Sequence, residues 1–177
     1  MGSHKLFLCL GGNLGNKAEI FADTLQRIKN RMGQVQSLSS IYASPAWGFE
    51  SENEFWNRVV VVETCLSPLF VLEEIRIIEN HYGRKRESRS YSSRKMDIDI
   101  LFYDNLVMRS DELTIPHPLM EQRNFVLVPL LEVAPEFVHP VSGKTIAEIF
   151  RSCTDRSEIH RIDAGSGVNK SENFRNL

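Results

Sequence analysis

The chain has 177 residues, enough for one compact domain, and its 42% hydrophobic and 25% charged residues are typical of a globular protein. The formal net charge of −2 argues against a global field that would attract nucleic acid or an acidic membrane surface. No apolar run approaches the roughly 20 residues that span a bilayer, and no signal-peptide pattern is present, so we expect a cytoplasmic protein with neither nucleic-acid nor membrane partners.

The cysteines are odd in number and widely spaced, at Cys9, Cys65 and Cys153. This pattern suits a reducing compartment and argues against a disulfide framework or a zinc site. Cys9 and Cys65 lie in apolar runs, so we expect both thiols to be buried.

The first elements predicted along the chain are a strand, a helix and a second strand. The apolar run 5–10 predicts a buried strand. Asn16, with Glu19 three residues later, has capping-box spacing and predicts the start of a helix that ends near Gly33. Residues 34–42 predict the second strand.

A loop, a strand and a helix follow. Residues 44–53 contain proline, glycine and polar side chains and predict a loop. The β-branched residues within 55–64 predict a central strand. Ser67 followed by Pro68 is typical of a helix start, and Gly83 of a helix end.

Residues 84–95 predict a long, mobile loop and residues 96–103 a strand. The order strand, helix, strand, strand, helix, strand predicts an α+β fold, a ferredoxin-like antiparallel sheet with a βαββαβ core and two helices on one face.

The remaining residues predict helical additions to this core. Residues 105–108 suggest a hairpin, and residues 118–133 a helical stretch interrupted near Pro129. Thr145 with Glu148 repeats the capping-box spacing. We expect a single monomeric domain over residues 5–160, an expression-tag remnant over 1–4 and a flexible tail over 161–177.

Asp97 and Asp99 stand two residues apart on the predicted strand. Alternate side chains share one face of a strand, so the two carboxylates should lie side by side, roughly 6.6 Å apart. Like charges in this position repel, which suggests a cation between them. Hard oxygen ligands without histidine or cysteine suit Mg²⁺ shared with phosphates. Asp-x-Asp alone is a weak motif and is more typical of a solvated strand with two surface acids.

The loop that leads into these carboxylates is strongly basic, with six lysine or arginine residues and one acid between Arg84 and Lys95. Arginines clamp phosphate oxygens and stabilise charge that develops during transfer. A solvated loop or a nucleic-acid patch is the alternative, and the neighbouring acids favour a polyphosphate.

Three weaker signals accompany the charged residues. The turn Gly11–Gly15 between a strand and a helix suits a backbone that approaches a ligand, or a plain tight turn. The rings of Phe55 and Phe125 suit stacking on the two faces of a flat heterocycle, with Asn57 at its edge. Most phenylalanines, however, are simply core residues. His117 lies in a proline-rich turn, which favours phosphate binding modestly.

Together these segments resemble the 6-hydroxymethyl-7,8-dihydropterin pyrophosphokinase family of folate biosynthesis. The resemblance covers residues 5–150 and rests on the order and spacing of Gly11–Gly15, Ser44-Pro45, Phe55–Asn57, Gly83-Arg84, Arg94–Leu101, Pro116–Pro118 and Arg123–Phe125.

The resemblance implies that pyrophosphate passes from ATP to the pterin hydroxyl, with release of AMP. It implies that Asp97 and Asp99 hold two Mg²⁺ ions and that Arg84, Arg94 and Asp97 act in the transfer. The implied ATP contacts are Glu79, Arg84, Arg86, Arg94, Ile100, Thr114, His117 and Arg123. The implied pterin contacts are Ser44, Pro45, Trp47, Phe55, Asn57 and Phe125.

The chain departs from the family pattern at several positions. Gly12 stands where the family usually has serine, and Tyr91 where it has tryptophan. Arg89 has no implied role, and the tail from Arg161 matches nothing. Two other interpretations remain open: a ferredoxin-like module that binds RNA or a small regulator, and another Mg²⁺-dependent nucleotidyl or phosphoryl transferase with a different acceptor.

Overall fold

The computed structural model describes residues 2–83 and 92–162. The predictions for Arg84, Arg86, Arg89 and Tyr91, and for the tail beyond Ile162, lie outside the described residues.

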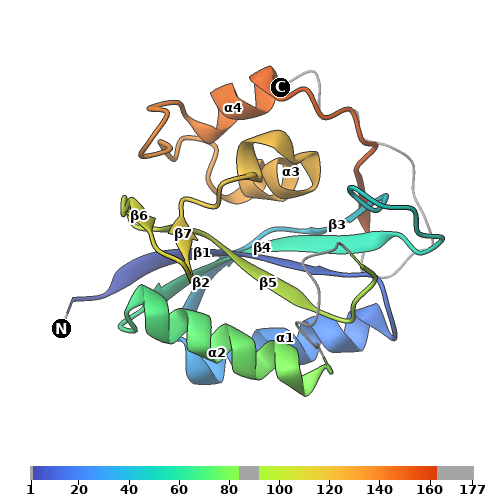
Figure 1. The fold of residues 1–177 in the computed structure, drawn as a ribbon, viewed down its shortest axis with the longest axis horizontal. Helices are drawn as coiled ribbons and strands as arrows, with labels where there is room; N and C mark the ends of the chain where they lie inside the picture. Colours follow the sequence, from blue (N-terminus) through green and yellow to red (C-terminus); the bar gives the residue numbers. More distant parts are fainter. Residues whose placement is uncertain (1, 84–91, 163–177) are drawn as a thin grey trace.

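An antiparallel sheet forms the middle layer of the protein (Figure 1). Its strand order is β5–β1–β4–β3–β8, and β2 also pairs with β4. The strands are β1 (His4–Gly12), β2 (Gln34–Leu38), β3 (Ile41–Ser44), β4 (Phe55–Thr64), β5 (Asp97–Tyr103) and β8 (His160–Ile162). With β2 and β3 as two halves of one strand position, this order confirms the predicted ferredoxin-like fold.

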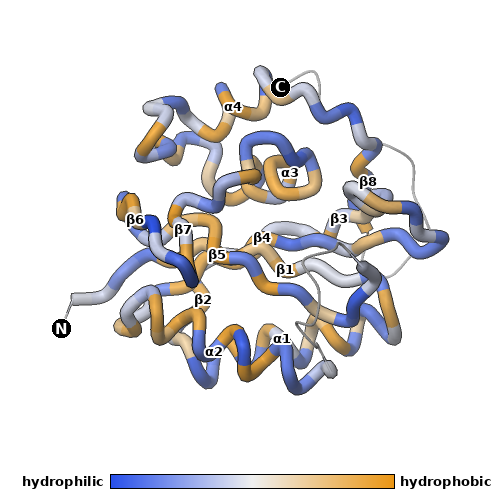
Figure 2. The backbone as a smooth tube through the Cα atoms, viewed as in Figure 1, coloured by the Kyte–Doolittle hydropathy of each residue, from blue (hydrophilic) through white to orange (hydrophobic). Residues whose placement is uncertain are grey.

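Helices α1 (Lys17–Arg31) and α2 (Pro68–His81) cover one face of the sheet. Hydrophobic and hydrophilic residues alternate along both helices, as expected of helices with one side on a sheet (Figure 2). The Asn16 side chain accepts a hydrogen bond from Glu19 N, which confirms the predicted cap of α1. Pro68 is the first residue of α2, and Gly83 has a φ of 79° after its end, as predicted.

Helices α3 (Asn124–Val133) and α4 (Ile146–Ser152) cover the opposite face. The predicted capping box of Thr145 and Glu148 is present at the start of α4. The predicted interruption near Pro129 is wrong: α3 runs through it, and the break lies at Arg123, between the short 3-10 helix Met120–Gln122 and α3. Pro129 lies in the middle of α3 and removes one backbone hydrogen bond, and burial of Val126, Leu127 and Leu130 against the sheet compensates for this loss.

The predicted strand 34–42 is divided at Ser39 and Ser40. The Ser39 hydroxyl accepts from Val59 N at 2.9 Å, and Glu132 of α3 accepts from Ser40 N at 2.8 Å. Side chains thus satisfy backbone groups that a continuous ladder would pair, so β2 ends at Leu38 and β3 begins at Ile41.

Three further expectations need correction. The hairpin beyond β5 consists of β6 (Met108–Arg109) and β7 (Thr114–Ile115), because Asp104 and Asn105 form the tight turn that ends β5. Cys65 is exposed, since it lies in the turn after β4 ends, whereas Cys9 is buried as predicted. Strand pairing also continues beyond residue 160, with Ile162 of β8 opposite Ile41.

Strand β5 contains a bulge. Ile100 pairs with Leu8 and Phe102 with Phe7, so Leu101 is an additional residue without an opposite partner. As a result Leu101 and Phe102 both face α3 and α4, whereas Ile100 and Tyr103 face α1 and α2.

In the parts of the chain that the structure describes, no helix has the length and apolar character needed to cross a bilayer.

Candidate active site

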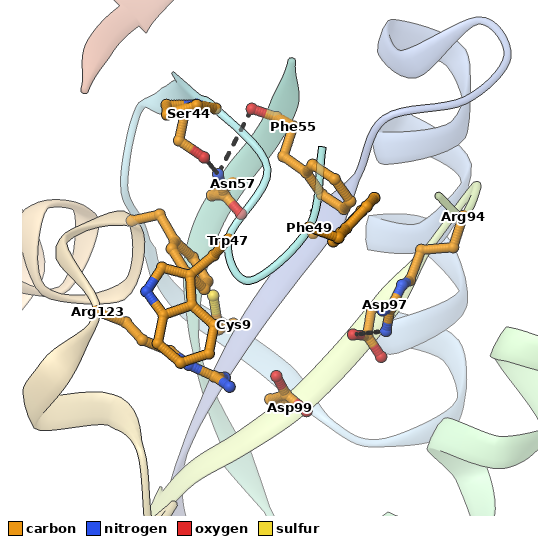
Figure 3. A pocket seen from close by; sticks show the side chains of 13 residues that line it. Cys9, Ser44, Trp47, Phe49, Phe55, Asn57, Arg94, Asp97, Asp99 and Arg123 are labelled. Atoms are coloured by element: carbon orange, nitrogen blue, oxygen red, sulfur yellow. Dashed lines mark hydrogen bonds and ion pairs between the residues drawn. The ribbon is translucent and has the colours of Figure 1, made fainter. Parts of the chain in front are cut away.

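A cavity with a volume of about 550 Å³, its open mouth included, lies where β1, β4 and β5 meet the loop after β3 and the start of α3. Its lining joins carboxylates, arginines, aromatic rings and a buried amide (Figure 3). The lining residues are Cys9, Gly11, Ser44, Pro45, Trp47, Phe49, Phe55, Asn57, Arg94, Asp97, Asp99, Arg123 and Phe125.

Asp97 and Asp99 both line the cavity, and Ile98 between them is buried under α1 and α2. The predicted alternation of β5 is therefore present. Arg94 Nη1 donates to Asp97 Oδ2 at 2.5 Å, so positive charge already neutralises one of the two carboxylates.

On the other side of β1, strand β4 carries a buried amide. Asn57 is 2% exposed, and its Nδ2 donates to Ser44 Oγ at 2.9 Å and to Phe55 O at 3.5 Å. Its Oδ1 faces Gly11, where a Cβ would lie only 3.3 Å from this oxygen. The hydrogen bonds fix the amide so that its acceptor oxygen is the atom turned to the cavity floor (Figure 3).

Aromatic rings form the sides of the cavity. Phe55 and Phe125 both line it, and Phe49 lies edge-on to Phe55, with centroids 5.9 Å apart and an interplanar angle of 89°. The guanidinium carbon of Arg123 is 4.5 Å from the centroid of the Trp47 ring and 5.6 Å from that of Phe125. Such cation–π contacts hold the arginine at the aromatic end of the cavity.

His117 lies beside the carboxylates. Its backbone N–H donates to Leu101 O at 3.0 Å, and its Nδ1 accepts from Leu119 N at 3.2 Å. The ring proton is therefore on Nε2, which is 4.0 Å from Asp99 Oδ2. Burial, followed by the positive charge of Arg123, lowers the pKa of His117 to about 4, so the imidazole is neutral at physiological pH.

Four described residues implied as nucleotide contacts lie outside the cavity lining: His117, Glu79, Ile100 and Thr114. Glu79 is 1% exposed and accepts from Ile98 N at 3.0 Å, so it fixes the backbone between the two aspartates. The Ile100 side chain is packed in the core under α1 and α2. Thr114 is part of β7.

Asp97 and Asp99 are the candidate metal ligands of the cavity. Within residues 2–83 and 92–162, no three histidine, cysteine or carboxylate side chains gather into a complete metal site. Two adjacent carboxylates in an open cavity suit a cation that takes its remaining ligands from water and phosphate.

Comparison with known proteins decides between the interpretations. The model of the family "7,8-dihydro-6-hydroxymethylpterin-pyrophosphokinase (HPPK)" matches residues 7–135. The chain belongs to the HPPK family. This assignment removes the RNA-binding module from consideration.

Relatives of the HPPK family resemble most of the chain. A 2-amino-4-hydroxy-6-hydroxymethyldihydropteridine pyrophosphokinase of Aquifex aeolicus is 36% identical over 143 residues, which cover 81% of this chain and 88% of the relative. The folic acid synthesis protein FOL1 of Dictyostelium discoideum is 35% identical over 91% of this chain, which spans only 24% of that protein. The wild-type HPPK-DHPS of Plasmodium falciparum has the same fold, with a TM-score of 0.69, 16% identity, and coverage of 84% of this chain and 44% of that one.

The HPPK cavity has two lining residues that the sequence had not indicated, Cys9 and Phe49, and it also contains Gly11 of the glycine turn. Cys9 lies opposite Asp99 and Gly11 opposite Asp97 across the β1–β5 ladder. Strand alternation from the apolar run 5–10 places both on one face, and this signal was available. Phe49 depends on the path of an irregular loop, for which no local pattern exists.

Proposed function

We propose that this chain transfers pyrophosphate from ATP to 6-hydroxymethyl-7,8-dihydropterin and releases AMP. The observation that carries the proposal is one cavity with two functional ends: an aromatic pair with a buried amide, and two carboxylates with an arginine. Membership of the HPPK family supports a pterin at the aromatic end and a pyrophosphate donor at the charged end.

The aromatic end fits a flat, hydrogen-bonding ring. We propose that the pterin stacks between Phe55 and Phe125, because aromatic faces bind heterocycles through dispersion and burial of apolar surface. The Oδ1 atom of Asn57 accepts a hydrogen bond from the edge of the ring. Ser44, Pro45 and Trp47 close the remaining sides, since all three line the cavity.

The charged end fits a triphosphate with Mg²⁺. Asp97 and Asp99 are the residues that would hold two magnesium ions, which neutralise phosphate charge and orient the transferred group when bound. Arg94 lies within 2.5 Å of Asp97 and would also contact the phosphates. We propose Arg84 and Arg86 as further phosphate ligands, with Arg84 aiding the transfer, and Glu79, Ile100, Thr114, His117 and Arg123 as nucleotide contacts.

The chemical step is a direct displacement at the β-phosphorus. The pterin hydroxymethyl oxygen forms a bond to that phosphorus, the bond from the β-phosphorus to the oxygen bridging it to the α-phosphorus breaks, and AMP carries away the bridging oxygen. We propose Asp97 as the acceptor of the hydroxyl proton. Most of the rate enhancement then comes from alignment and charge neutralisation, as in other phosphoryl transfers.

The test is an assay of the protein with ATP, MgCl₂ and 6-hydroxymethyl-7,8-dihydropterin, with nucleotides separated by chromatography. We expect AMP in amounts equal to the pterin pyrophosphate formed, and none when pterin is omitted. Formation of ADP would indicate a simple kinase and contradict the proposal. AMP formed only with a different alcohol would assign another acceptor.

We further propose that the enzyme acts as a cytoplasmic monomer without membrane or nucleic-acid partners. The free thiols of Cys9, Cys65 and Cys153 and the net charge of −2 support this assignment. Sedimentation equilibrium at micromolar concentration tests it, and a mass of twice 20.3 kDa would contradict it.

A further inference from the structure

A buried side chain outside the cavity connects its two walls. Asn13 directly follows β1, is 3% exposed and does not line the cavity. It lies where the segment before β5 and the loop between β3 and β4 approach the end of β1. Because the side chain is buried, its amide must find hydrogen-bond partners within the protein.

The Asn13 amide fixes, first, the segment that carries Arg94. Asn13 Oδ1 accepts from Arg94 N at 2.9 Å, and Nδ2 donates to Ser93 Oγ at 2.9 Å. The backbone adds to this attachment, because Asn13 N and Leu14 N both donate to Arg94 O, at 2.9 and 3.2 Å.

The close approach of this segment depends on Gly12. A Cβ at Gly12 would lie 2.3 Å from Lys95 O, so a side chain at this position would require the backbone before β5 to shift away from the end of β1. The hydrogen bonds of Asn13 and the missing side chain of Gly12 therefore place Arg94 within reach of Asp97.

The same amide also fixes the loop on the aromatic side. Asn13 Nδ2 also lies 3.2 Å from Ser51 Oγ and 3.4 Å from Asn53 O, and its two hydrogens are shared among these acceptors and Ser93. Ser51 and Asn53 bond to each other as well, at 3.1 and 3.2 Å, so the amide holds a preformed turn. This turn ends the loop that supplies Trp47 and Phe49 to the cavity.

We infer that Asn13 is a positioning residue that holds the pterin-side loop and the phosphate-side Arg94 in one fixed arrangement, so that a single buried amide serves both substrates. The inference rests on the proposed function. It differs from a role in stability alone, because it predicts separate effects on the two substrates when the two halves of the network are cut separately.

The experiment compares Asn13→Ala, Ser51→Ala and Ser93→Ala with Asn16→Ala, which removes the cap of α1 from the same turn and contacts neither wall. KM for ATP, KM for the pterin, kcat and Tm are measured for each. We expect Asn13→Ala to raise both KM values about tenfold and to lower kcat, since several buried hydrogen bonds are lost together. Ser51→Ala should raise only the pterin KM, Ser93→Ala only the ATP KM, and Asn16→Ala should lower Tm with both KM values unchanged.

The result that overturns the inference is an Asn13→Ala enzyme with a lower Tm and unchanged KM values and kcat. If Asn13→Ala does not fold, the two serine variants decide. A raised pterin KM in Ser51→Ala together with a raised ATP KM in Ser93→Ala supports the inference, and unchanged KM values refute it. Failure of the proposed function appears separately, as absence of pterin-dependent AMP formation by the unmodified protein.

Discussion

Replacement of Asn57 by alanine tests the aromatic end of the cavity most directly. The side chain is 2% exposed, and its loss leaves Ser44 Oγ, in a residue that is 1% exposed, without its donor at 2.9 Å. One lost hydrogen bond and one unsatisfied hydroxyl destabilise the fold by about 1–3 kcal/mol. In a domain of this size, that corresponds to a decrease in Tm of about 3–10 °C.

The pterin should also bind more weakly. A donor on the ring edge that loses its acceptor stays buried and unpaired, which costs about 1–3 kcal/mol, or about 5- to 150-fold in affinity. KM for ATP should remain unchanged, because β1 separates the amide on β4 from Asp97 and Asp99 on β5.

The assay is AMP release with each substrate varied in turn, together with a thermal unfolding curve. Ser44→Ala, which keeps Asn57 Oδ1 in place, should raise the pterin KM less than Asn57→Ala does. Asn30→Ala, on the exposed side of α1, serves as a control without effect. A pterin KM that changes less than about threefold in Asn57→Ala, while Tm falls as expected, would assign the amide to the core alone.

Three other predictions concern the charged end, the ring stack and pH. Asp97→Asn and Asp99→Asn should each lower kcat by about a thousandfold or more with Tm nearly unchanged, since both side chains line an open cavity; substantial turnover in either variant would remove that residue from the metal site. Phe125→Ala should weaken pterin binding by about 1–3 kcal/mol in a fluorescence titration without weakening ATP, and an equal loss for ATP would contradict the stacking role. Burial lowers the pKa of His139 below its ordinary value of 6.5, so below pH 6.5 the unfolded chain binds a proton that the folded chain does not. The free energy of unfolding should therefore fall as pH decreases from 6.5, and denaturant titrations should show a smaller decrease in His139→Asn, because the contribution of His139 is removed while that of His117 remains.

Local signals in the sequence predicted most of the fold. Val59–Val62 marked β4, Pro68 marked the start of α2, and the box of Thr145 and Glu148 marked the start of α4. Each of these signals acts through neighbouring residues only, which is why the sequence alone contains them. The division at Ser39 and the uninterrupted α3 depend on contacts between distant segments, such as Glu132 with Ser40. No local pattern can indicate such contacts.

The same distinction applies to the site. Alternation along β5 placed Asp97 and Asp99 together without knowledge of any other strand. Phe49 and Asn13 depend on how the loop between β3 and β4 folds back on the end of β1, so their importance appears only in three dimensions. The roles proposed for Arg84 and Arg86 stay predictions, since both lie outside the described residues.

The bulge in β5 has a consequence for which changes this strand tolerates. Before Leu101, odd-numbered side chains point to the cavity; after it, the even-numbered Phe102 takes over that side. Deletion of Leu101 itself would only remove the bulge: Asp99 and Phe102 would stay on the cavity side and Ile100 would stay beneath α1 and α2. Deletion of Ile100, with Leu101 and Phe102 kept in their places in the core, would instead turn the upstream half of the strand over. Ile98 would then enter the polar cavity, and both carboxylates would be forced beneath α1 and α2. The strand therefore tolerates the loss of its bulge residue, whereas the loss of a residue between the bulge and the carboxylates abolishes the site.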